Sequence, residues 1–343
     1  MGPSAAGPAS ADPPPVAGRA DETDLPRVAG RADEADPARH LAAVLAIEEA
    51  GPDEYTGDCP AQAFDRIYGG QLAAQALLSA ARTVRPGLRP ISVHTNFLRI
   101  GVVREPVTYT IERAADGRAL ANRVVHARQA GRLLSVSVVA FQDAATEHPL
   151  VDHDRLAGVP PGLEPPPGLE PPPGLAPPPG PESLPTRDQS LAEHFGDAIT
   201  STMTMSSWPI EVRYVDRAPW TAGRAAPRNR LWMRSMAGLP DDDLIHCAVL
   251  LYAADLHLPE PILFPHELTW YELVNGIKVF GASLDYSMWF HRPFRFDGFL
   301  LHEQEAQAVA NSRGLTTGRF STRDGVLVAS AAELVGILAR EGR

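Results

Sequence analysis

Hydrophobic and polar positions recur in the same order in the two halves of this chain. Residues 70–84 are rich in Ala and Leu at helical spacing, and a second helical run spans about 242–258. Each helical run precedes four stretches with strand-like alternation, at 91–98, 106–113, 121–128 and 132–141 in the first half and at 283–294, 299–309, 315–322 and 326–338 in the second. One helix followed by an antiparallel meander, twice over, predicts an α+β fold in which each sheet packs on its own long helix.

Composition predicts where the folded parts begin and end. Residues 1–40 hold a near-repeat, VAGRADETD and VAGRADEAD, among prolines, and are expected to form a disordered tail. Residues 146–200 contain PPGLEPPPGLEPPPGLAPPPG, which predicts an extended linker; the alternative is a docking segment for a proline-binding partner. The folded domains are therefore expected at 41–145 and 201–343, with the catalytic candidates in the second.

Charge and cysteine content argue against several classes of protein. The 343 residues carry 31 basic and 42 acidic side chains, a net charge of −11, which disfavours binding to nucleic acid or to an anionic membrane. The two cysteines show no metal-ligand spacing, so neither a metal nor a cofactor is expected. No apolar run approaches the roughly 20 residues of a membrane span, and the N-terminus lacks the pattern of a signal peptide. A cytoplasmic location is expected, and homo-oligomerisation is left open.

An acidic residue lies on an apolar helix face. Asp255 shares its stripe with Tyr252, Leu251, Ala248 and Leu244. Three aspartates at 241–243 suit the start of this helix, which places Asp255 near its end, where the macrodipole disfavours a negative charge. Position and burial both oppose ionisation, so Asp255 is a candidate for chemistry. Taken alone, it also fits a polar residue at a fraying helix end.

A second acidic residue interrupts an apolar row in the last strand-like run. Strict alternation puts Glu333 on the apolar face of that strand. In the run at 283–294, the same rule puts Ser283 with Asp285 on the face opposite Tyr286. If Asp255, Ser283 and Glu333 converge, they could hold and deprotonate a water. Glu333 alone also fits an exposed sheet edge, and a serine is ordinary at the start of a strand.

This polar set belongs to the second half only. Aligning the turn at Gly131 with that at Gly325 places Val139 where Glu333 stands, and the helical run at 70–84 has no acidic residue. No GxSxG, P-loop, HExxH or GxGxxG motif occurs, which weakens serine-hydrolase, nucleotide-binding and zinc-peptidase functions. The chemistry is therefore expected in the second half.

Five stretches carry a family resemblance: YGGQLAAQAL and HTNFLRIG in the first half, and YAADL, LDYSMWFHRPF and RDGVLVASAAE in the second. Over nearly all of residues 55–340, apart from the linker, the chain resembles the acyl-CoA thioesterase II family, the TesB type. The resemblance implies a tandem (double) hotdog, its two sheets edge to edge, that hydrolyses acyl-CoA to free fatty acid and CoA. It also implies that Asp255, Ser283 and a residue of the last strand hold the attacking water.

The last of these positions departs from the family pattern. The family's VASxxQ reads VASAAE here, so Glu333 stands in place of a glutamine. An ionised glutamate only accepts hydrogen bonds, whereas a glutamine also donates them. Two carboxylates around one water repel, so the mechanism requires that one acid keeps a proton. The expected function is a thioesterase with Asp255 as general base; the alternatives are a non-catalytic acyl-CoA-binding protein and a hotdog enzyme of the enoyl-CoA hydratase type.

Overall fold

The computed structural model describes residues 36–60, 66–146, 178–196, 208–274 and 278–339. The first half contains α1 (Pro37–Leu45), β1 (Ile47–Gly51), β2 (Glu54–Gly57), α2 (Gly69–Ala81), β3 (Leu88–Phe97), β4 (Val107–Asp116), β5 (Leu120–Gln129), β6 (Arg132–Asp143) and η1 (Ala144–Thr146). The second contains η3 (Pro181–Ser183), α3 (Arg187–Phe195), β7 (Ile210–Tyr214), β8 (Arg228–Ser235), α5 (Asp243–His257), η5 (Glu260–Ile262), η6 (Phe264–His266), α6 (Trp270–Val274), β9 (Val279–Phe290), β10 (Leu300–Ala310), β11 (Arg313–Ser321) and β12 (Leu327–Ala339).

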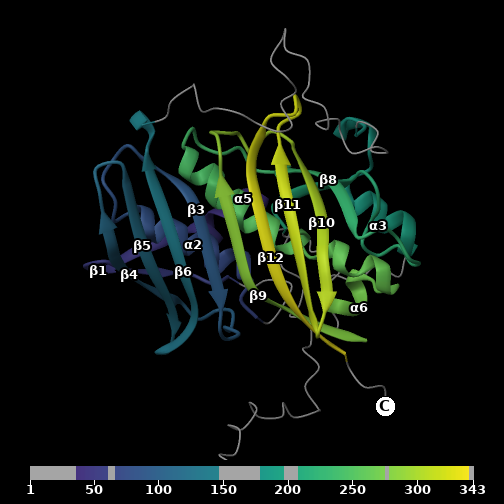
Figure 1. The fold of residues 1–343 in the computed structure, drawn as a ribbon, viewed down its shortest axis with the longest axis horizontal. Helices are drawn as coiled ribbons and strands as arrows, with labels where there is room; N and C mark the ends of the chain where they lie inside the picture. The colour runs from purple at the N-terminus through teal and green to yellow at the C-terminus, as the bar shows by residue number, and fades with distance from the viewer. Residues whose placement is uncertain (1–35, 61–65, 147–177, 197–207, 275–277, 340–343) are drawn as a thin grey trace, which may run out of the picture.

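All twelve of these strands belong to one antiparallel sheet with the order β1-β2-β4-β5-β6-β3-β9-β12-β11-β10-β8-β7. The two halves meet where β3 pairs with β9, and His94 lies opposite Ser287 in this pair. In Figure 1 the purple-to-teal strands of the first half therefore continue directly into the green and yellow strands of the second. Neither half has an unpaired edge at the junction.

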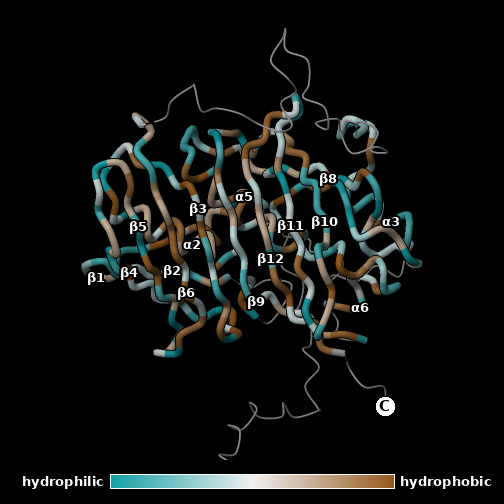
Figure 2. Tube along the Cα trace, in the orientation of Figure 1, coloured by the Kyte–Doolittle hydropathy of each residue, from teal (hydrophilic) through white to brown (hydrophobic). Residues whose placement is uncertain are grey.

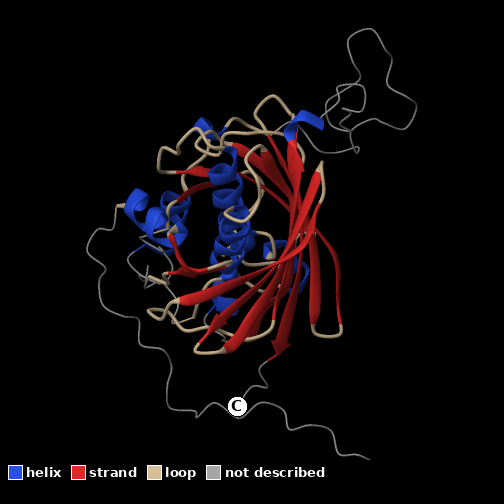
Figure 3. Ribbon diagram, turned by 90° about the vertical axis from the view of Figure 1, so that its left-hand side faces the viewer, coloured by secondary structure: helices blue, strands red, loops and turns tan. Residues whose placement is uncertain are grey.

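The two long helices lie together on one side of the curved sheet (Figure 3). α2 packs on β3, β4, β5 and β6, α5 packs on β3 and β9, and the two helices contact each other. Figure 2 shows hydrophobic (brown) stretches around both helices, in keeping with α2, which is buried over 70–80, and α5, which is buried over 246–257. The segment Asp243–His266 is long and apolar enough to cross a membrane, but its most apolar stretch of 18 residues is wholly buried inside the fold. The sequence predicted a helix at about 242–258 but no apolar run of this length, and its burial is what a core helix shows.

The sequence predicted both long helices and the eight long strands. It missed β1, β2, β7 and β8, which have 4, 5 or 8 residues and carry several charged side chains, so that their alternation is weak. It also missed α1, which begins at Pro37 within the range expected as a tail, and α3, which lies within the range expected as a linker. A capping box of Thr186 and Gln189 starts α3, a signal that could have been read. The division into domains otherwise stays a prediction, because residues 1–35 and 147–177 lie outside the described structure.

Candidate active site

Asp255 lies in the last turn of α5 and faces the first turn of α2. Its side chain is 4% exposed, and the Gly70 N–H donates a hydrogen bond to its Oδ2 across 2.9 Å. Tyr68, the N-cap residue of α2, makes no side-chain capping bond, so Asp255 supplies from the other half the acceptor that a helix start requires. The positive end of the α2 dipole also favours a carboxylate at this point. The prediction that Asp255 is buried on the apolar face is confirmed.

Two glycines allow the helices to approach so closely. A Cβ on Gly70 would lie 2.5 Å from the carbonyl oxygen of Tyr252, and one on Gly69 would lie 3.0 Å from Oδ2 of Asp255. Any side chain at Gly70 would therefore push the start of α2 away from the end of α5. The sequence reasoning missed this contact, although two successive glycines at the start of an Ala-rich helix are a signal of close backbone approach.

Ser283 and Glu333 meet on neighbouring strands. The Ser283 hydroxyl donates to Oε1 of Glu333 across 2.6 Å, and Glu333 is fully buried, as predicted. The predicted face of Ser283 is wrong, because β9 carries a bulge. Ser283 pairs with Val335, Asp285 pairs with Leu334, and the extra residue Leu284 breaks the alternation between them. The bulge turns Ser283 to the inner face, where it reaches Glu333.

Burial raises the pKa of both acids. The pKa of Asp255 rises to about 7 through burial, although the Gly70 N–H and the Tyr68 hydroxyl lower it in part. The pKa of Glu333 rises well above its usual value through burial and the nearby charge of Asp255, while the Ser283 hydroxyl opposes the shift. Two acids this close in an apolar setting hold at least one proton near neutral pH. Of the two, only Glu333 has its pKa raised by the charge of the other acid in addition to burial.

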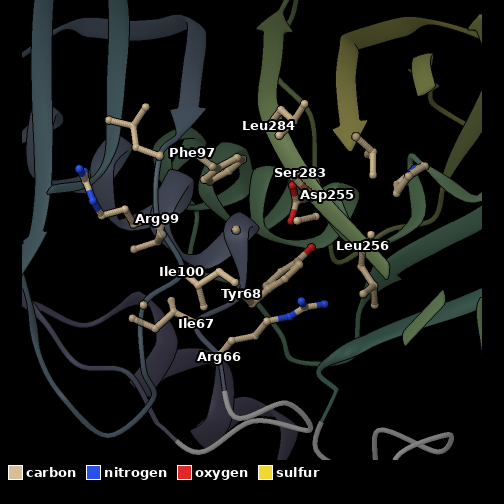
Figure 4. Close-up of a pocket in the computed structure, with 18 of the residues that line it drawn as sticks. Arg66, Ile67, Tyr68, Phe97, Arg99, Ile100, Asp255, Leu256, Ser283 and Leu284 are labelled. Carbon is tan, nitrogen blue, oxygen red and sulfur yellow. The ribbon is translucent and has the colours of Figure 1, made fainter. Parts of the chain in front are cut away.

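A cavity of about 270 Å³ opens beside these groups, between the two halves. Its wall is mostly apolar and includes Phe97 and Leu72 from the first half and Leu256 and Trp270 from the second. Figure 4 shows the oxygen atoms of Asp255 and Ser283 facing each other, with the hydroxyl of Tyr68 pointing toward them. Among the described residues, Asp255 Oδ1 and Glu333 Oε2 are buried without a hydrogen-bond partner. These oxygens are able to bind a water molecule.

Tyr68 is a further residue of this site that the sequence reasoning missed. Its hydroxyl donates to the carbonyl oxygen of Tyr252 across 2.7 Å, and its ring meets the Tyr252 ring edge-on at 5.3 Å. The bond fixes the Tyr68 side chain against α5, one turn before Asp255. In the sequence Tyr68 is distinguished only by its place directly before the glycine pair. Its role becomes visible in the contact between the two halves.

The first half has no equivalent acid. Val139 is buried on β6 opposite Val93 of β3, in the place that Glu333 occupies in the second half. α2 has no acidic residue in its first turn and none along its length. No group of three or more His, Cys, Asp or Glu side chains suited to a metal occurs in the described part of the chain. Among the described residues, the buried acids therefore all lie in the second half.

Comparisons with known proteins place the chain in a family. A model described as acyl-CoA thioesterase matches residues 199–338, and one described as acyl-CoA thioesterase N-terminal domain matches residues 56–142. Human acyl-coenzyme A thioesterase 8 is 31% identical over 295 residues, which cover 85% of this chain and 87% of the human protein. The chain belongs to the acyl-CoA thioesterase family. The predicted TesB-type resemblance is thereby confirmed, and members of the family are named as hydrolases of acyl-CoA thioesters.

Solved structures agree with this membership. The acyl-CoA thioesterase II TesB2 of Mycobacterium marinum is 29% identical, with a TM-score of 0.66, and the match covers 88% of this chain and all of the other. A protein from Alicyclobacillus acidocaldarius, described as having a hot dog fold, is 17% identical, with a TM-score of 0.65 over 88% of this chain and 98% of its own. The fold of this acyl-CoA thioesterase family member is therefore of the hotdog type, as predicted.

Proposed function

We propose that the protein hydrolyses acyl-CoA to a free fatty acid and CoA by direct attack of water on the thioester carbonyl. The observation that carries the proposal is the buried carboxylate of Asp255, held by the N–H of Gly70 through Oδ2 while Oδ1 has no partner among the described residues and the side chain lines an apolar cavity. A base with a pKa of about 7 is well matched to deprotonating water near neutral pH.

Each polar group has a role in this reaction. Asp255 takes a proton from the water as its oxygen attacks the carbonyl carbon, while Ser283 and Glu333 hold the water in line. Gly69 lines the cavity at the positive end of α2, where the helix dipole stabilises negative charge on the carbonyl oxygen. The apolar wall binds the acyl chain, and no cofactor takes part.

The organisation of the chain follows the same proposal. The two halves form a tandem hotdog, in which α2 and α5 are the central helices and the acyl site lies between them. Lipid metabolism in the cytoplasm is the proposed setting, homo-oligomerisation remains open, and neither a nucleic acid nor a membrane is a proposed partner. Support comes from the shared order of elements in the two halves and from the balance of charge.

Release of free thiol from short, medium and long acyl-CoAs tests the proposal. We expect wild-type turnover and a loss of about 100-fold or more in Asp255→Asn, because a general base contributes at least this much. Asp188→Asn is the control: it makes the same change at an exposed position of α3, outside the cavity wall, and should change turnover little. Tight binding of acyl-CoA without thiol release would indicate a binding protein. Hydration of an enoyl-CoA with its thioester intact would indicate a hydratase.

A further inference from the structure

Ser283 stands between the cavity and Glu333. Ser283 lines the cavity, whereas Glu333 is fully buried behind it and joined to it by the 2.6 Å hydrogen bond. When Glu333 carries a proton on Oε1, it donates to the serine oxygen across the same 2.6 Å, and the serine hydroxyl then turns toward the cavity. A proton on Glu333 can therefore reach the cavity through the serine hydroxyl.

Glutamate can supply what a glutamine cannot. The family pattern has glutamine at this position, and an amide has no proton to give at neutral pH. Thioester hydrolysis needs a proton in addition to a base, because the departing thiolate of CoA must become a thiol. Asp255 starts ionised in order to accept a proton from water, so it has no proton of its own to give before the attack.

We propose that Glu333 delivers a proton, through the hydroxyl of Ser283, to the sulfur of the leaving CoA. The proposal rests on the thioesterase function above. As the C–S bond breaks, its electron pair goes to sulfur, which takes the proton of the Ser283 hydroxyl, and the serine oxygen takes the proton of Glu333. The water proton is then on Asp255 and Glu333 is an anion. Transfer of that proton from Asp255 to Glu333 restores the starting state, so the protons balance.

The two acids assist each other in sequence. While Asp255 is negative, its charge holds the proton on Glu333. When Asp255 takes up the water proton, that charge disappears and Glu333 becomes a stronger acid at the moment when the thiolate forms. Asp285 of β9 also raises the pKa of Glu333.

Two tyrosines also face these acids, Tyr68 beside α2 and Tyr286 of β9. Burial raises the pKa of both phenols well above the usual value, and the charges of Asp255 and Glu333 add to the shift. Both phenols therefore stay neutral while Asp255 and Glu333 exchange protons. On β11, Thr316 lies opposite Glu333, and its hydroxyl does not titrate.

The test compares two thioesters of one fatty acid, acyl-CoA and an aryl thioester whose acidic thiol leaves without a proton. For Glu333→Gln we expect kcat to fall about 100-fold further on acyl-CoA than on the aryl ester, the lower end of general acid–base contributions. A loss shared by the two esters reports the role of Glu333 in holding the water. Ser283→Ala should show the same selectivity in addition to a loss on both esters, because it interrupts the relay and removes a hydroxyl that holds the water. The KM for acyl-CoA and the melting temperature of Glu333→Gln show whether the site stays folded.

Other outcomes separate this inference from the proposed function. Equal loss on both esters in Glu333→Gln would mean that Glu333 only positions the water, and unchanged turnover on both would remove it from the reaction; either result overturns the inference. Asp255→Asn should lose activity on both esters, since water attack is needed in each case. If Asp255→Asn behaves in this way while Glu333→Gln shows no selectivity, the thioesterase mechanism stands and only the proton relay fails. Absence of thiol release from both esters by the wild type overturns both.

Discussion

The backbone N–H of Gly70 and the carboxylate of Asp255 lie 2.9 Å apart, and this bond connects the start of α2 to the end of α5. The two residues are 185 positions apart in the chain. The bond caps one helix with a side chain from the other and holds the candidate base in place. The position of the base and its pKa therefore depend on the same contact.

Replacing Gly70 with alanine should separate the two helices. The new Cβ would lie 2.5 Å from the backbone oxygen of Tyr252, which cannot rotate away. We expect Gly70→Ala to lower the free energy of unfolding by roughly 1–3 kcal/mol, as overpacking does, and to lower kcat/KM at least tenfold. Urea unfolding and thiol release measure the two effects. Gly238→Ala is the control, because no atom lies within 4 Å of a Cβ there; similar losses in both variants would refute the steric explanation.

The rate should follow the ionisation of Asp255. Because the base must be negative, kcat/KM is expected to rise with pH to a midpoint at about 7. Tyr68→Phe removes a hydroxyl that lowers the pKa of Asp255, so the midpoint should move to higher pH. Tyr109→Phe is the matched control, since its buried hydroxyl bonds Gln75 within the first half. A midpoint that is the same in Tyr68→Phe and the wild type would show that this tyrosine does not act on the base.

Asp255 should cost the protein stability at alkaline pH. Its folded-state pKa of about 7 exceeds the ordinary value of 3.8, so between these values the folded state holds a proton that the unfolded state has lost. The free energy of unfolding therefore falls as pH rises through this window. Asp255→Asn removes the effect and should be more stable than the wild type by on the order of 2 kcal/mol at pH 8. Urea unfolding of both proteins at pH 5 and pH 8 measures the difference in their free energies of unfolding. A difference that is the same at the two pH values would contradict the prediction.

Glu260, a buried acid outside the cavity wall, should contribute to stability. Glu260 is 2% exposed. Its side chain accepts a hydrogen bond from the Tyr214 hydroxyl across 3.0 Å and pairs with Nδ1 of His257 across 2.8 Å. Glu260→Ala leaves these groups buried without their partner, and we expect a loss of about 3 kcal/mol by urea unfolding. Glu182→Ala breaks an exposed ion pair with Arg323 and should cost less than about 1 kcal/mol. Equal costs would mean that burial does not decide the strength of these contacts.

Periodicity predicted the elements that carry the chemistry but not how they meet. The stripe around Asp255 and the alternating row around Glu333 correctly placed both acids inside. The same alternation misplaced Ser283, because the bulge at Leu284 becomes visible only when β9 is paired with β12. The Gly70 bond was likewise beyond reach, since it depends on where two helices distant in sequence lie. The local sequence pattern determines which side chains are buried, whereas the packing of the two halves determines which of them lie in contact.

The pairing of β3 with β9 has an evolutionary consequence. In an assembly of two identical chains, every substitution in a catalytic residue appears at both sites. Each chain must then carry a catalytic site of its own and also support the site of its partner. Here one polypeptide contains both halves, so each is free to change independently. The second half holds the acids, while the first has Val139 at the corresponding position and contributes the N-terminus of α2. Within one chain, the first half can therefore act as a scaffold that presents the acids of the second.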